Sequence, residues 1–174
     1  MPKEFARVPH EFRMIKMAKS PYNVESGASF RRAGVTTMRA QLVELMENLP
    51  GSRDGVDIEA LHDMRVASRR LRAVMSVFGP AFPSGKFREL EKEVSKVTDA
   101  LGSVRDSDVL IEYFTDCSKG LELTHQVGTQ AVIVHLQQER DRNRVELVRE
   151  LNRLEKSKFL KCFNRMLEAD TEVS

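Results

Sequence analysis

Apolar residues recur at intervals of three and four along most of the chain, which is the spacing of one face of an α-helix. The first such pattern covers residues 30–48 and ends at the pair Pro50 and Gly51. A second covers residues 57–78, with Asp57 as its predicted N-cap and a Gly-Pro pair directly after it. The predicted core face of this second helix consists of Met64, Ala67, Leu71, Val74, Met75 and Phe78.

The helical pattern continues after a loop at residues 79–85. A third helix is predicted to end at Gly102, and a short fourth helix, capped by Asp106, is predicted to reach about residue 114. Residues 124–168 predict one long helix, or two helices with a bend near Ser157. The predicted core positions are Phe87, Leu90, Val94, Val97 and Leu101 in the third helix, then Val134, Val145, Val148, Leu151, Leu154, Phe163 and Leu167.

The fold class that follows is all-α, with loops short enough for antiparallel neighbours. No segment alternates apolar and polar residues as a β-strand does. Residues 1–28 have no sustained period and are predicted to form a flexible arm, so the helical bundle is assigned to residues 29–170. The chain has 174 residues and is 41% hydrophobic, which is enough for one buried core.

The composition says more about the compartment in which we expect the protein than about the molecule that it binds. The 28 Lys and Arg residues are balanced by 26 Asp and Glu, so net charge indicates neither a nucleic-acid nor a membrane partner. Cys117 and Cys162 lie far apart without metal-ligand spacing, and the first twenty residues contain no apolar stretch typical of a signal peptide. The sequence contains no run of about 18 apolar residues, so it predicts no membrane span. We therefore expect a cytoplasmic protein.

The most informative local pattern is a row of cations on the second helix. His62, Arg65, Arg69 and Arg72 fall within an arc of about 80° and extend about 15 Å along the axis. Residues 64–88 contain no Asp or Glu, so none of these arginines has an acidic partner three or four residues away. Guanidinium groups match phosphate oxygens, and we therefore predict that the row binds an external anion.

The alternative is a solvated face neutralised by acids from adjacent helices, for which Glu44, Glu47 and Glu89 are candidates. Asp106 and Asp108 are interpreted as helix-capping residues rather than metal ligands, because no His or Cys lies near enough to complete a site. No cofactor motif is present. Secondary candidates for the anion site, whose orientation periodicity does not settle, are Arg70, Lys92, Lys96, Arg32, Arg39, Arg140 and Arg144.

Two motifs carry a family resemblance. The first is His62-Asp63-Met64-Arg65 followed by Arg69-Arg70-Leu71-Arg72, and the second is Leu101-Gly102-Ser103-Val104-Arg105-Asp106-Ser107-Asp108-Val109. In both, the chain resembles the CHAD domain, the conserved histidine α-helical domain. The segments Ser20-Pro21-Tyr22 and Leu154-Glu155-Lys156-Ser157-Lys158-Phe159 are similar to the edges of the family, so the resemblance covers about residues 20–168.

The resemblance implies an antiparallel four-helix bundle and the binding of inorganic polyphosphate in a basic channel, often at polyphosphate granules. It also places Arg105 among the ligand-binding residues. Family members usually contain two such halves related by a pseudo-twofold axis, and no second His-and-Arg motif is present in this sequence. The chain is therefore either one half of the usual arrangement or a protein whose two copies pair as a homodimer.

Two other function classes are less well supported. A nucleic-acid-binding module shares the electrostatics, but aromatic content is 6% without Trp, which leaves little for base stacking. The other class is an enzyme, such as a phosphatase that uses His62 and Asp63. The sequence does not support it, because it has no P-loop, no HExxH motif and no nucleophile paired with a base. We therefore expect a non-catalytic polyphosphate-binding domain.

The position of His62 at the head of the cationic row predicts a pH dependence of binding. A bound polyanion favours the charged imidazole, so affinity for polyphosphate should rise as pH falls through the range in which histidine titrates. Titrations in mildly acidic and mildly alkaline buffers measure this effect. Equal affinity across that range would exclude His62 from the site.

Overall fold

The computed structural model describes residues 27–55 and 58–168, and in this part of the chain it contains helices and turns but no strand. The all-α class is therefore confirmed. The predicted arm at residues 1–28 lies almost wholly outside the described residues. The elements are α2 (Phe30–Glu47), α3 (Leu49–Asp54), α4 (Ile58–Phe78), the 3-10 turn η1 (Gly79–Ala81), α5 (Ser84–Ser118), α6 (Leu123–Lys156) and α7 (Phe159–Glu168).

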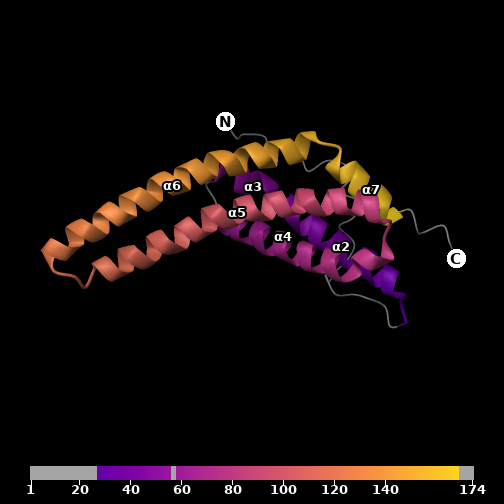
Figure 1. The fold of residues 1–174 in the computed structure, drawn as a ribbon, viewed down its shortest axis with the longest axis horizontal. Helices are drawn as coiled ribbons and strands as arrows, with labels where there is room; N and C mark the ends of the chain where they lie inside the picture. The colour runs from indigo at the N-terminus through magenta and orange to yellow at the C-terminus, as the bar shows by residue number, and fades with distance from the viewer. Residues whose placement is uncertain (1–26, 56–57, 169–174) are drawn as a thin grey trace, which may run out of the picture.

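The helices pack mainly against their neighbours in the chain. Helix α2 packs on α4, α4 on α5, and α5 on α6, while α3 contacts both α4 and α6. The two longest helices, α5 and α6, run antiparallel, and their connected ends extend well beyond α2 and α4 as a two-helix hairpin (Figure 1). The molecule therefore has a thick end built from all the helices and a thin end built from two.

The core lies in the thick end, where every α-helix contributes apolar side chains. The predicted core faces of the second and third helices are confirmed, because Met64, Ala67, Leu71 and Met75 of α4 are buried and Val74 and Phe78 pack against them. Full burial of one such side chain contributes about 1.5–3 kcal/mol. The predicted third-helix positions are all buried in α5, namely Phe87, Leu90, Val94, Val97 and Leu101.

The segment after the first helix differs from the prediction. Pro50 and Gly51, predicted to end the first helix, lie instead within the short helix α3 at residues 49–54. Pro50 occupies the first turn of α3, where a missing backbone N–H breaks no helical hydrogen bond. Gly55, with φ of 72°, ends α3 in the left-handed conformation. The predicted N-cap Asp57 lies outside the described residues.

The predicted break at Gly102 is wrong. Helix α5 runs without interruption from Ser84 to Ser118. Gly102 has no positive φ, and the neighbouring Leu101 and Val104 are buried, which holds the backbone helical through the glycine. The cost of a glycine inside a helix, about 1 kcal/mol, is smaller than the gain from burying those two side chains.

Of the two alternatives predicted for residues 124–168, the structure has two helices with a bend at Ser157. Helix α6 ends at Lys156, and the Ser157 hydroxyl accepts a hydrogen bond from the Phe159 N–H at 3.1 Å where α7 begins. Leu151, Leu154, Phe163 and Leu167 are buried as predicted and Val148 is half-buried. Val134 and Val145, however, are exposed, because they lie on the side of α6 that faces away from α5.

One glycine sets the distance between α2 and α4. A Cβ atom at Gly34 would lie 2.8 Å from Cγ and 2.9 Å from Cβ of Phe78. Those atoms are close to the α4 backbone, so a side-chain rotation does not relieve the contact. The two helices therefore approach each other closely only because residue 34 has no side chain.

We expect Gly34→Ala to lower the free energy of unfolding by about 1–3 kcal/mol, since it forces α2 and α4 apart. Gly102→Ala is the matched control, because a Cβ there meets nothing within 4 Å. It should raise stability by about 0.5–1 kcal/mol through its higher helix propensity. Urea unfolding followed by circular dichroism measures both, and equal effects of the two variants would contradict the proposed close contact.

Candidate functional site

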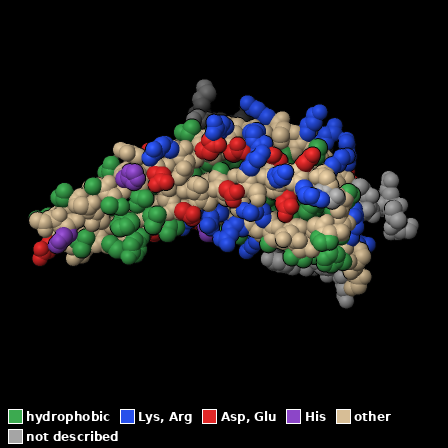
Figure 2. All heavy atoms as spheres, viewed as in Figure 1, with side chains coloured by type: hydrophobic (Ala, Val, Ile, Leu, Met, Phe, Trp, Pro, Cys, Tyr) green, Lys and Arg blue, Asp and Glu red, His purple; other side chains and the backbone are tan. Residues whose placement is uncertain are grey.

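The cationic row of the sequence lies along α4 beside α5. We call His62, Arg65, Arg69 and Arg72 the basic stripe. His62 and Arg69 are exposed, and Arg65 and Arg72 are half-buried. Figure 2 shows Lys and Arg side chains gathered over the lower middle of the molecule, where α4 runs beside α5, with acidic side chains between them.

Two arginines of the stripe have acidic partners on an adjacent helix, as the alternative interpretation expects, but the partners are aspartates of α5 rather than the three glutamates that were named. Arg72 Nη1 lies 3.1 Å from Asp99 Oδ1, and Arg65 Nη2 lies 3.6 Å from Asp106 Oδ1. Both aspartates are exposed, and exposed pairs of this kind contribute about 0–1 kcal/mol. The pairs therefore neutralise the stripe only weakly.

Arg69 differs from its neighbours on the stripe. Within residues 27–55 and 58–168 it has neither an ion pair nor a hydrogen bond. Because α4 and α5 are antiparallel, the two ion pairs place Arg69 opposite the residues midway between Asp99 and Asp106, which are Gly102 and Ser103. Neither of these residues is charged, and Gly102 has open space at its Cβ position. Within the described part of the chain, Arg69 thus stands without a partner between two weakly paired arginines.

The three glutamates predicted to neutralise the arginines of α4 do so only to a small extent. Of Glu44, Glu47 and Glu89, only Glu44 forms an ion pair with an arginine of α4. Its Oε1 atom lies 3.8 Å from Arg70 Nη1. Arg70 is exposed, and its ion pair points it toward α2 rather than α5.

Two lysines extend the basic face along α5. Lys92 and Lys96 lie at helical spacing from Asp99 and therefore share its face, so the face continues past Arg72 toward the start of α5. Lys96 Nζ donates to Glu93 Oε1 at 3.0 Å, whereas Lys92 is exposed and has no such partner in the described part of the chain. The stripe and these lysines together form what we call the α4/α5 basic face.

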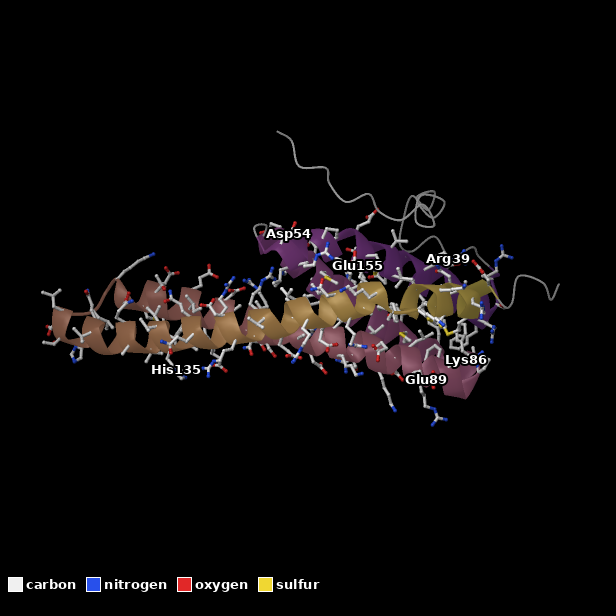
Figure 3. All side chains as sticks on the ribbon, turned by 90° about the horizontal axis from the view of Figure 1, so that it is seen from above. Arg39, Asp54, Lys86, Glu89, His135 and Glu155 are labelled. Carbon is white, nitrogen blue, oxygen red and sulfur yellow. The ribbon has the colours of Figure 1, made fainter. Side chains whose placement is uncertain are left out.

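The remaining candidates lie apart from this face. Arg105 is half-buried and points about 100° around α5 from Asp106. Arg39 lies on α2 at the α7 end of the molecule (Figure 3), and Arg32 lies seven residues earlier on α2. The structure therefore does not group these three arginines with the stripe.

Arg140 and Arg144 of α6 hold helices together. Arg140 Nε donates to Asp108 of α5, and the Arg144 guanidinium donates to the backbone carbonyls of Ser52 and Arg53 in α3. Burial and the nearby charge of Arg140 lower the pKa of Arg144 below its ordinary value. The N–H donors of both arginines already bind protein oxygens, so the structure gives no support for a direct role of either residue in anion binding.

Glu93 connects the basic face to α6. Its carboxylate accepts hydrogen bonds from Lys96 and from Arg153 of α6. Burial raises its pKa, but the two hydrogen bonds and the positive charges of Lys96 and Arg153 outweigh burial, so the pKa lies below its ordinary value of 4.5. Lys96 is thus partly occupied by an internal carboxylate.

The sequence reasoning missed Asp99 and Gly102 as parts of this site. The signal was present, because Asp99 and Asp106 are separated by seven residues, as are Arg65 and Arg72. Two antiparallel helices with equal spacings of opposite charge can pair at both positions at once. Recognising that match required the continuity of α5 through Gly102, which the predicted helix stop concealed.

Other chemistry has little support in the described residues. Among them, no three His, Cys, Asp or Glu side chains are grouped as a metal site would require. Their helices also include none with the length and apolar character needed to cross a membrane. Cys117 and Cys162 are free and exposed.

Comparison with known proteins gives one match. A family model described as the CHAD domain matches residues 36–173, a range that includes the basic stripe and the α5 segment opposite it. Neither the curated proteins nor the solved structures contain a match to this chain.

The low pKa of Glu93 predicts a stability change with a defined pH window. Because the folded-state pKa is lowered, the stabilisation is complete above the unfolded value near 4.5 and is lost as pH falls through the lower folded value. Glu93→Gln should therefore reduce the free energy of unfolding by about 1–3 kcal/mol at pH 7. The difference from the unsubstituted protein should shrink as pH falls below about 4.5.

Urea unfolding at several pH values between 3.5 and 7 measures this difference. Glu91→Gln, two residues earlier on the same helix, is the matched control and should change stability little. A Glu93→Gln effect of the same size at every pH would contradict the ionic origin of the interaction.

Proposed function

Because the chain belongs to the CHAD domain family, we propose that it binds inorganic polyphosphate on its α4/α5 basic face. CHAD domains in general bind polyphosphate-type ligands. The observation that carries the proposal for this chain is Arg69, which is exposed and stands opposite Gly102 without a carboxylate partner in the described residues. An arginine held in this way is ready to bind a phosphate.

The arrangement favours a chain of phosphates over a single one. A single phosphate gains the full interaction only at Arg69, and it is repelled by Asp99 and Asp106 on either side. A linear polymer lying along the stripe replaces the weak ion pairs of Arg65 and Arg72 with charge-assisted hydrogen bonds to phosphate oxygens. Binding at several positions, with release of the polymer's counterions, then offsets the repulsion.

The same reasoning leads to a binding module rather than an enzyme, since catalysis needs a nucleophile or metal that this proposal does not require. We further propose that α2, α4, α5 and α6 correspond to one four-helix half of the family arrangement. A protein that captures polyphosphate in this way is expected to associate with polyphosphate granules.

Removing the arginines of the stripe should weaken binding and reduce its salt dependence. For Arg65→Ala/Arg69→Ala/Arg72→Ala we expect affinity for long-chain polyphosphate to fall at least a hundredfold in low salt. The slope of log K against log salt should decrease by about 2, or 0.7 for each of three phosphate contacts. Isothermal titration at several NaCl concentrations measures both quantities.

The matched control removes three exposed cations of similar spacing, two from α7 and one from the residue directly before it, in the variant Lys158→Ala/Lys161→Ala/Arg165→Ala. This variant should retain most of the affinity. Equal losses in the two triple variants would show that only overall charge matters. If RNA displaces polyphosphate at equal phosphate concentration, a nucleic-acid-binding function replaces the proposed one.

The gap opposite Arg69 can be tested by filling it. Gly102→Glu places a carboxylate beside Arg69 and should lower affinity about tenfold, which corresponds to about 1.4 kcal/mol. Gly102→Ala keeps the gap uncharged and should bind as the unsubstituted protein does. If both variants bind alike, Arg69 is not the central contact.

A further inference from the structure

The hairpin at the thin end of the molecule exposes apolar side chains. We define the hairpin as residues 105–138, the connected ends of α5 and α6 (Figure 1). Single exposed apolar residues are ordinary, but a concentration of them in one region indicates a contact surface. Figure 2 shows hydrophobic side chains over this thin end, and those exposed there are Val109, Leu110, Tyr113, Leu121, Leu123, Val127, Val132 and Val134.

Part of this surface forms a stripe along α6. Leu123, Val127, Ala131 and Val134 share one side of the helix, and we call them the outer α6 stripe. Leu123 is 80% exposed and Val127 is 73% exposed. The stripe lies opposite the buried side of α6 that packs against α5. No other described helix lies beside this part of α6 (Figure 1).

The same stretch of α6 carries no formal charge. Residues 123–138 contain no Asp, Glu, Lys or Arg, although these four types make up 31% of the chain. The solvent face of a helix in a monomeric protein normally carries such residues, since they keep it soluble. A face that is exposed, apolar and uncharged has the composition of the centre of an interface.

We propose that the outer α6 stripe packs antiparallel against the same stripe of a second copy of this chain. A twofold axis brings residues near it against their own symmetry equivalents, so any charge there would meet a like charge. The uncharged segment avoids this repulsion along the stripe, because His125 and His135 lie on other sides of α6, and its centre falls between Gln130 and Ala131. Val127 of one copy then faces Val134 of the other, and the small Ala131 side chain next to the axis allows a close approach.

The size of the contact sets the expected affinity. The uncharged segment is about 24 Å long, and a single helix pair of that length buries less than the roughly 800 Å² per partner of a standard interface. We therefore expect a dimer that forms at micromolar or higher concentration. The outer α6 stripe and the α4/α5 basic face lie on opposite sides of α5, so this inference does not depend on the proposed function.

Molar mass measured by light scattering between about 1 and 300 µM tests the proposal, using the full chain. The mass should rise from one chain toward two as concentration increases. Val127→Glu should remain one chain, because the glutamate places a charge in the contact. Val77→Glu is the matched control, since Val77 is 59% exposed on α4, and its mass should follow that of the unsubstituted protein.

Cross-linking tests the position of the axis. With both exposed cysteines replaced, in the background Cys117→Ser/Cys162→Ser, Ala131→Cys should form a disulfide between two copies under mild oxidation. Glu89→Cys in the same background lies at the other end of α5 and should not (Figure 3). Circular dichroism checks that each variant is folded.

Several outcomes would overturn the proposal. They are a mass of one chain at every concentration, a Val127→Glu variant that still dimerises, and a cross-link no stronger for residue 131 than for residue 89. Binding of the monomer to phosphatidylcholine vesicles, lost in Val127→Glu, would assign the stripe to a lipid surface instead. Val127→Glu should keep its affinity for a short polyphosphate, so failure of this proposal and failure of the proposed function can be told apart.

Discussion

The antiparallel packing of α4 on α5 is the contact on which the candidate site depends. Buried side chains of both helices, among them Met64 and Leu71 of α4 and Val94 and Leu101 of α5, hold them in one register. That register places Asp99 and Asp106 beside Arg72 and Arg65, and Gly102 beside Arg69. The charge pattern of the surface is therefore a consequence of the packing of the core.

The aspartates explain how a row of like charges remains compatible with a stable helix. Unscreened arginines at such spacings repel one another, and weak ion pairs to α5 reduce that repulsion while no ligand is bound. Because the pairs are exposed, exchanging them for phosphate contacts in the complex that we propose would cost little. In that proposal, the same two aspartates also disfavour a single phosphate.

The basic residues of the chain have different tasks that their spacing alone does not distinguish. Arg140, Arg144 and Arg153 donate to carboxylates or carbonyls of other helices and connect α6 to α3 and α5. The basic face is instead confined to α4 and the adjoining side of α5, and the thin end of the molecule is almost uncharged on α6. The two surfaces for which we propose binding partners are thus separated along the molecule.

The amino-acid sequence by itself determined the all-α class, the extents of α2 and α4 and the basic stripe, and it offered the bend at Ser157 as one of two alternatives. These features depend on periodicity, capping and breaking residues, which act within one helix. Only the tertiary structure decided that α5 continues through Gly102, that Arg65 and Arg72 have partners while Arg69 has none among the described residues, and that Val134 and Val145 are exposed. These features depend on which residue of one helix stands beside which residue of another, and that pairing arises from contacts between segments far apart in the sequence.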